Sequence, residues 1–191
     1  MLSVVIPTHD SERALVPTLA ALVSGAVAGV VREVIIADAG SADATAEIAD
    51  GAGCRVLILR EPRGARLKAA AGSARAPWLL FLPPGSVPDA TWTDEVRRFV
   101  EETTSRGCAD SHAAAFRRAS RSFRPTLIEA LALLGSALGA RPRASQGLLI
   151  AKTLYDRIGG HRRDGESPED DLARRLGRRI VLLRAGAMAL S

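Results

Sequence analysis

The amino-acid sequence predicts an α/β fold in which helices flank a mostly parallel central sheet. Short apolar runs, several of them rich in Val and Ile, alternate with longer segments whose apolar residues recur at helical spacing. The early runs are apolar throughout, which is typical of parallel strands buried on both faces. The chain has 191 residues and 47% hydrophobic content, enough to bury one sizeable core. We therefore expect a single domain over residues 1–191.

Four strands are expected in the first part of the chain. They cover residues 2–6, 33–37, 55–59 and 78–82. Asp10 and Ser11 are suited to cap the first helix, in which Pro17 is tolerable only near the first turn. Ser41 is suited to cap a second helix that ends at two glycines, and a third helix is expected over residues 65–75.

The second part of the chain is less regular. Helices are expected near residues 89–104 and over residues 126–138. A short helix that follows residue 150 is expected to end at residue 158, and the last helix runs from residue 167 or 168 through 176. Strands are expected around residues 112–116 and over 180–183. A glycine-rich, charged loop covers residues 159–167.

The chain is basic, with a formal net charge of +5 and an isoelectric point near 10.2. Only Lys68 and Lys152 are lysines, so arginine supplies nearly all of the positive charge, and alanine is abundant. This combination is typical of a GC-rich, bacterial-like composition, and it is also compatible with an anionic small-molecule partner; the two readings stay open. Nucleic acid is not expected as a partner.

Other features bear on the cellular compartment. Cys54 and Cys108 lack the Cys/His spacing of a zinc site, so we expect two reduced core residues. The chain opens on a strand-like segment without a basic leader. Its longest apolar run, residues 126–140, is too short to span a bilayer and contains Glu129. These features predict a cytoplasmic protein.

Candidate ligand-binding residues follow the expected strands, because open α/β sheets bind ligands beyond the carboxyl ends of their strands. The polar residues at these positions are Thr8, His9, Asp10, Asp38, Arg63, Arg66 and Lys68. Hydroxyl, carboxylate and guanidinium groups suit a nucleotide with its phosphates. Neither G-x-G-x-x-G nor G-x-x-x-x-G-K-[ST] occurs, which disfavours a dinucleotide-dependent dehydrogenase and a P-loop NTPase.

Two strand-to-helix junctions resemble those of the family 2 glycosyltransferases. Residues 3–10 read Ser-Val-Val-Ile-Pro-Thr-His-Asp, and residues 33–45 read Glu-Val-Ile-Ile-Ala-Asp-Ala-Gly-Ser-Ala-Asp-Ala-Thr. The likeness continues through residues 62–64 and 78–82 and past Gly159-Gly160 to an acidic helix. It covers most of the chain.

The resemblance implies a Rossmann-like GT-A fold that binds a nucleotide-diphospho-sugar and transfers its sugar, with inversion, to an unknown acceptor. It implies a nucleotide-binding half over residues 1–86 and an acceptor-side half over residues 87–191. By resemblance, contacts to the base, the ribose and the diphosphate come from Pro7, Thr8, His9, Asp38, Arg63 and Arg66.

The resemblance also implies a catalytic base on the acidic helix of residues 167–176. An ungapped match places Glu169 at the usual aspartate, whereas a slip of one residue makes Glu169 and Asp170 the acidic pair, with Asp171 next to them. These alternatives stay open, as does the alternative that the acids only complement the helix dipole.

One departure from the family concerns the divalent metal, Mg or Mn. Where the family carries an acidic motif after the fourth strand, this chain has Pro83, Pro84 and Gly85. We therefore expect altered or absent metal dependence, with arginines neutralising the leaving diphosphate. The alternative is a catalytically inactive nucleotide-binding or assembly module. A nucleotidyltransferase would need a basic, Gly-rich loop after the first strand, which residues 8–13 are not.

The apolar helix expected over residues 126–138 is flanked by arginines on both sides. It is expected to pack over the acceptor side of the sheet or to form a homodimer contact. The alternative is a peripheral contact with an anionic membrane, which would suit a lipid-linked acceptor.

Overall fold

The computed structural model describes residues 1–118, 147–163, 165 and 167–189. The helix expected over residues 126–138, with its membrane and dimer alternatives, lies outside these residues. The first part contains β1 (Leu2–Thr8), α1 (Glu12–Val27), β2 (Val31–Asp38), α2 (Thr45–Gly51), β3 (Arg55–Ile58), α3 (Arg63–Ser73) and β4 (Trp78–Phe81). The second part contains β5 (Ser86–Pro88), α4 (Trp92–Ser105), β6 (Ala113–Arg118), β7 (Leu148–Ala151), α6 (Lys152–Arg157), α7 (Pro168–Leu176), the 3-10 turn η2 (Gly177–Arg179) and β8 (Ile180–Ala189).

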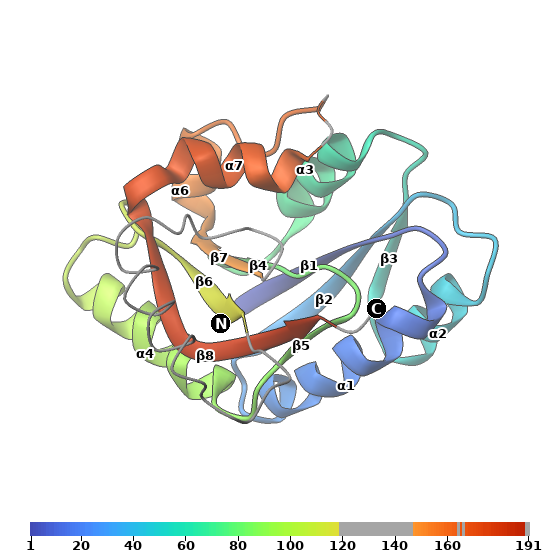
Figure 1. Cartoon of the computed structure of the whole chain (residues 1–191), viewed down its shortest axis with the longest axis horizontal. Coiled ribbons are helices and arrows are strands. Elements are labelled where there is room, and N and C mark those ends of the chain that lie inside the picture. The colour runs from blue at the N-terminus through green and yellow to red at the C-terminus, as the bar shows by residue number, and fades with distance from the viewer. Residues whose placement is uncertain (119–146, 164, 166, 190–191) are drawn as a thin grey trace, which may run out of the picture.

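The strands of the described residues form one sheet of eight strands in the order β3-β2-β1-β4-β7-β6-β8-β5. β1 pairs in parallel with β2 and β4, while β7 is antiparallel to β4. Helices α1, α2 and α4 lie along one face of the sheet, and α3, α6 and α7 along the other (Figure 1). The strand order reverses at β1, so the connections diverge at the carboxyl ends of β1 and β4. This is where α/β sheets bind ligands.

Some expected elements differ from the structure. The strand β5 was not expected, because three residues are too few to give a pattern; it is antiparallel to the end of β8, with Ser86 opposite Ala189. β8 itself has 10 residues and runs well past residue 183. Pro17 lies inside α1 rather than near its first turn, since the helix begins at Glu12.

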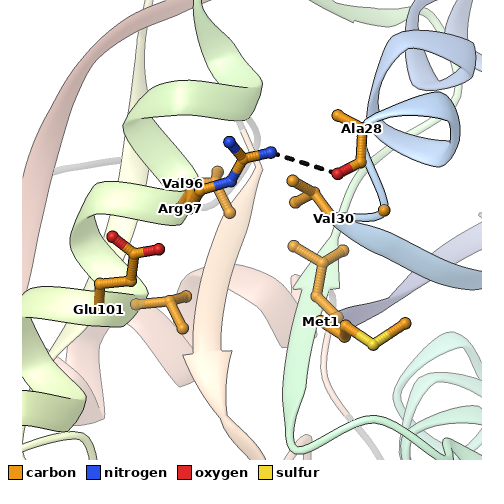
Figure 2. A pocket seen from close by; sticks show the side chains of 9 residues that line it. Met1, Ala28, Val30, Val96, Arg97 and Glu101 are labelled. Carbon is orange, nitrogen blue, oxygen red and sulfur yellow. Dashed lines mark hydrogen bonds between the residues drawn. The ribbon is translucent and has the colours of Figure 1, made fainter.

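The amino-terminal edge of the sheet holds a pocket of about 230 Å³. Its lining comes from the start of β1, the turn between α1 and β2, and one side of α4 (Figure 2). Arg97 reaches across it and donates to the carbonyl of Ala28 at 3.2 Å. This pocket lies at the edge opposite to the residues that were expected to bind a ligand.

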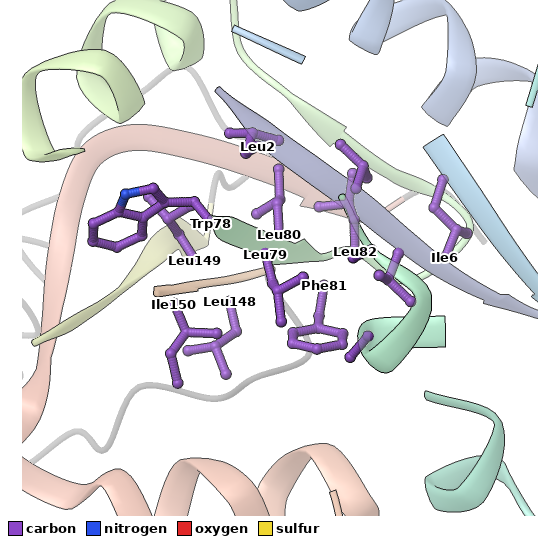
Figure 3. Packing of buried hydrophobic residues seen from close by; sticks show 14 of the residues in the cluster. Leu2, Ile6, Trp78, Leu79, Leu80, Phe81, Leu82, Leu148, Leu149 and Ile150 are labelled. Atoms are coloured by element: carbon purple, nitrogen blue, oxygen red, sulfur yellow. The ribbon is translucent and has the colours of Figure 1, made fainter. Parts of the chain in front are cut away.

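The hydrophobic core extends across both parts of the chain. The four residues of β4 are buried, and they pair with β1 on one side and β7 on the other (Figure 3). Trp78 packs edge-on against Phe99 of α4, with ring centroids 5.9 Å apart. β4 therefore lies at the centre of the sheet and packs against α4 through Trp78.

Both cysteines are free thiols. Cys54 is buried, and burial raises the pKa of its thiol to about 11; Cys108 is only half-buried, contrary to the expected core position. Among the described residues, every helix is too short or too polar to cross a bilayer.

Candidate functional site

The carboxyl ends of β1 and β2 are joined by a buried bracket of side chains. Thr8 and Asp38 stand opposite each other in the register, and the Thr8 hydroxyl donates to Asp38 Oδ1 at 2.7 Å. Arg66 of α3 donates through Nη1 to the carbonyls of Thr8 and Ala37, at 2.8 and 2.7 Å. Its Nε donates to the carbonyl of Glu61 at 3.1 Å. Three predicted nucleotide-binding residues are thus brought together, as the parallel strand order requires.

The Asp38 carboxylate is occupied by neighbours in its own turn. The backbone N–H groups of Gly40 and Ser41 donate to Oδ2 at 2.8 and 2.7 Å, and the Ser41 hydroxyl donates to Oδ1 at 2.6 Å. Burial opposes ionisation, but the bonds from Ser41, Thr8 and Gly40 outweigh it and hold the pKa of this carboxyl below its usual value. A carboxylate has about four acceptor positions, and Asp38 is 1% exposed. Direct contact between this carboxylate and a nucleoside stays a prediction that the hydrogen bonds do not favour.

Arg66 is likewise an internal residue, 6% exposed. Burial lowers the pKa of its guanidinium, and the charge of Arg63 adds to the effect. Its donors already hold three backbone carbonyls, so Arg66 positions the strand ends. The predicted contact of Arg66 with a diphosphate stays a prediction. Arg63 is more accessible than Arg66, since 40% of its side chain is exposed.

The helices α1 and α2 are capped by each other's loops. Asp43, before α2, accepts from the backbone N–H of Glu12 at 3.0 Å, and the Glu12 carboxylate accepts from Ala44 at 3.3 Å. Asp10 accepts from Ala42 at 2.8 Å. These bonds satisfy N–H groups at the start of both helices and lock the two loops together at the carboxyl edge.

The capping residues expected from the sequence are confirmed only in the position of Ser11. Ser11 occupies the N-cap position of α1, but its side chain makes no capping bond and donates instead to the carbonyl of His9. The N-cap of α2 is Ala44, and Ser41 lies before it, accepting from the backbone of Asp10. Local spacing missed these caps because their partners come from another loop.

The rest of the first loop is split between buried and open groups. Pro7 is buried within β1, opposite Ala37. The side chain of His9 is exposed, with Nε2 at 3.9 Å from a carboxylate oxygen of Asp10. Of the candidate residues in this loop, His9 and Asp10 have exposed side chains, at 66% and 50%.

The acidic helix α7 directs its first three carboxylates to different partners. Glu169 accepts from Nε of Arg63 at 2.6 Å, joining the first turns of α7 and α3. Asp170 accepts from the Ser167 hydroxyl at 2.8 Å, and Asp171 accepts from Nε of Arg175 at 2.9 Å. Only Glu169 therefore meets a predicted phosphate-binding residue, from 106 positions away in the chain.

The approach of α7 to α3 depends on a close backbone contact. A Cβ added to Gly64 would lie 1.8 Å from the carbonyl oxygen of Arg162 and 3.1 Å from that of Arg163. On the other side of this contact, Arg163 and Glu61 form an ion pair at 2.7 Å. The loop before α7 is thus packed onto the start of α3, which sets the position of Arg63.

The same loop buries a histidine. His161 is 1% exposed and packs edge-on against Phe81, with ring centroids 4.6 Å apart. The Tyr155 hydroxyl accepts from the His161 backbone N–H at 3.0 Å and lies 2.9 Å from Nδ1. Whether the hydroxyl donates to Nδ1 or accepts from it depends on which ring nitrogen carries the proton. Nε2 is buried without a partner among the described residues.

The loop after β4 does not fit a divalent metal. The backbone N–H of Gly85 lies 2.9 Å from both the carbonyl of Ala14 and the hydroxyl of Thr18, which tucks the loop onto α1. Pro83, Pro84 and Gly85 have no side-chain oxygen, and no cluster of three or more His, Cys, Asp or Glu that could hold a metal occurs among the described residues. Hard cations such as Mg²⁺ require oxygen ligands.

Several residues that shape the site carried no signal in the sequence. Arg175 donates to the carbonyls of Ile158 and Gly160 at 2.6 Å each, and so fixes the loop that holds His161. Tyr155 and Glu61 act through contacts with that same loop. None of these residues belongs to a local motif, so their roles could be found only from the packing.

Comparison with known proteins gives a family for the first part of the chain. Residues 3–82 match the family model described as Glycosyl transferase family 2. This segment runs from β1 to the end of β4 and contains the buried bracket. No curated protein matches the chain at the sequence level.

Solved structures match nearly the whole chain at low identity. S. aureus TarS 1-349 is 16% identical with a TM-score of 0.72, over 98% of this chain and 60% of that one. Its complex with UDP-GlcNAc is 18% identical with a TM-score of 0.69, over 100% and 59% of the two chains. Glucosyl-3-phosphoglycerate synthase from Mycobacterium tuberculosis, in complex with Mn²⁺ and UDP-Glc, is 21% identical with a TM-score of 0.65, over 95% and 68%.

The chain therefore spans 59 to 60% of the length of those TarS chains. At these identities the structures establish the fold, and the family match establishes the relationship of the first part of the chain. Residues 3–82 are thus similar to the family 2 glycosyltransferases, and the chain has the GT-A fold of the matched structures.

Proposed function

We propose that the chain binds a nucleotide-diphospho-sugar at the carboxyl edge of β1, β2 and β4 and transfers the sugar to an acceptor hydroxyl with inversion. The observation that carries the proposal is the contact between Arg63 and Glu169 at 2.6 Å. It brings a guanidinium suited to a diphosphate and a carboxylate suited to be a base to one point of this edge. The matched structures of TarS and glucosyl-3-phosphoglycerate synthase contain UDP-GlcNAc and UDP-Glc, respectively. These complexes support a UDP-sugar as the donor.

In the proposed binding mode, the buried bracket shapes the edge and the exposed groups meet the ligand. Thr8, Asp38 and Arg66 hold the ends of β1 and β2 together, so backbone groups of the loop after Pro7 face the nucleoside. His9 and Arg63 supply the side chains with open surface, for the nucleoside and the diphosphate respectively.

In the proposed reaction, Glu169 is the base. Its carboxylate accepts the proton of the acceptor hydroxyl while the hydroxyl oxygen forms a bond to the anomeric carbon. The bond between that carbon and the phosphate oxygen breaks, and the nucleoside diphosphate leaves with the electron pair. Arg63 stabilises the charge that develops on the leaving group. Asp170 is assigned to the first turn of α7, where Ser167 holds it.

A catalytically inactive binding module is the second candidate. It is favoured by the loop at Pro83, Pro84 and Gly85, which lacks the oxygen ligands that a metal-dependent transferase would use. In that case the ion pair between Arg63 and Glu169 would be a structural tie between α3 and α7.

Titration calorimetry with UDP- and GDP-sugars, with and without Mn²⁺, separates the two candidates. We expect binding of a UDP-sugar that does not need Mn²⁺, together with slow release of UDP in the presence of acceptor mixtures. Glu169→Gln should retain binding and lower the turnover rate by about 100-fold or more. Binding without turnover in the wild type would establish the module, and absence of binding to every nucleotide sugar would overturn both.

A further inference from the structure

The pair formed by Arg63 and Glu169 joins two groups that the proposed reaction needs apart. Arg63 must hold a phosphate oxygen of the donor, and Glu169 must accept a proton from the acceptor. Their contact at 2.6 Å places a carboxylate oxygen where the guanidinium would receive a phosphate oxygen. A carboxylate bound in this way is turned toward α3.

We propose that the donor diphosphate and the Glu169 carboxylate compete for Arg63, so that donor binding releases the base. This inference rests on the proposed function and adds a regulation to it: the acceptor is activated only after the donor is in place. An ion pair that is partly open to solvent is weak, since 40% of the Arg63 side chain and 18% of the Glu169 side chain are exposed. A diphosphate carries more negative charge than one carboxylate and can displace it.

The surroundings allow this exchange by side-chain movement alone. The carbonyl of Arg162 packs on Gly64, and Arg163 pairs with Glu61 at 2.7 Å. These contacts join the same two segments independently of Glu169. The loop before α7 therefore stays on α3 when Arg63 changes its partner.

The neighbouring acids do not replace Glu169 on Arg63. Asp170 accepts from Ser167 in its own turn. Asp171 lies among three arginines, with Arg175 at 2.9 Å, Arg162 at 3.5 Å and Arg174 at 3.7 Å. Glu169 is therefore the carboxylate that a diphosphate would displace from Arg63.

The test measures UDP affinity by calorimetry for the wild type, Glu169→Gln, Asp170→Asn, Arg63→Ala and the double variant Arg63→Ala with Glu169→Gln. If the carboxylate competes with the diphosphate, Glu169→Gln should tighten UDP binding by about 2- to 5-fold, which is the worth of an exposed ion pair. Asp170→Asn removes the same charge one residue away and should leave the affinity unchanged. Uridine, which has no phosphate, should bind the wild type and Glu169→Gln equally.

The double variant decides whether the gain passes through Arg63. In the Arg63→Ala background, Glu169→Gln should bring no gain. Three results would each overturn the competition. The first is that Glu169→Gln binds UDP no more tightly than the wild type. The second is that Asp170→Asn gains as much UDP affinity as Glu169→Gln, and the third is that the gain in UDP affinity persists without Arg63. If the wild type binds UDP and only the gain is missing, the inference fails by itself; if no variant binds UDP, the proposed UDP-sugar donor fails and the inference with it. All exchanged side chains are at least partly exposed, and circular dichroism checks that every variant is folded.

Discussion

His161 is kept neutral by its surroundings. Burial lowers the pKa of its ring to about 3, and the nearby charges of Arg175 and Arg63 act in the same direction. In an unfolded chain the pKa of histidine is about 6.5. Between these two values the unfolded state binds more protons than the folded state, so the stability contributed by the neutral ring is present above about pH 6.5 and is lost as the pH falls.

We expect acidification from about pH 7.5 to about pH 5 to lower the free energy of unfolding by about 2 kcal/mol through His161. Carboxyl groups titrate mainly below this window, and a variant at position 161 separates His161 from His9 and His112. The measurement is urea denaturation at a series of pH values, with His161→Phe as the comparison. The variant should show a smaller change in stability over the same range. Parallel profiles for the two proteins would mean that His161 is not the group responsible.

Among elements, α3 is the helix whose position affects the candidate site most. Its first turn carries Arg63, its second carries Arg66, and its Gly64 receives the carbonyl of Arg162 from the loop before α7. No side chain larger than hydrogen fits at Gly64 unless the loop moves away. The geometry of Arg63 and Glu169 therefore depends on a glycine that takes no part in any chemistry.

We expect Gly64→Ala to destabilise the protein by about 1–3 kcal/mol, because its methyl group would overlap the Arg162 carbonyl. Gly72, in the last turn of the same helix, is the matched control, since a Cβ there meets nothing within 4 Å. Gly72→Ala should be neutral or stabilising by up to about 1 kcal/mol. Chemical denaturation of both variants checks the contrast. Similar effects at the two positions would show that helix propensity, and not the loop contact, governs α3.

For the molecule as a whole, the sheet joins the two halves expected from the sequence. β4, at the end of the first half, pairs with β7 of the second along its full length, from Trp78 opposite Ala151 to Phe81 opposite Leu148. The face of β4 near α6 and α7 is also covered by the second half, where Tyr155 stacks on Phe81 at 5.3 Å. We therefore propose that residues 1–86 and 87–191 fold as one unit.

A fragment of residues 1–86 should accordingly not fold by itself. It would expose the free edge of β4 together with its apolar face, which favours aggregation. We expect a poorly dispersed amide NMR spectrum and no cooperative thermal transition, whereas the full chain should show both dispersion and a single transition. A fragment with a dispersed spectrum and cooperative unfolding would establish two independent domains.

The sequence by itself determined the order of strands and helices in the first part of the chain and the edge at which the candidate site lies. Both depend on local features: apolar runs give the strands, and the junctions after residues 8 and 38 mark their carboxyl ends. Because parallel neighbours end at the same edge, the closeness of Thr8 and Asp38 followed from the pattern.

Only the tertiary structure decided which of these polar residues are used inside the protein and which face outward. The side chains of Asp38 and Arg66 form hydrogen bonds within a turn and to backbone carbonyls. The caps of α1 and α2 come from each other's loops. Glu169 differs from Asp170 because it contacts Arg63. Each of these outcomes depends on burial or on a partner distant in sequence, 106 positions in the case of Glu169. Residue spacing carries no information about such contacts, because they are created by the packing of whole elements.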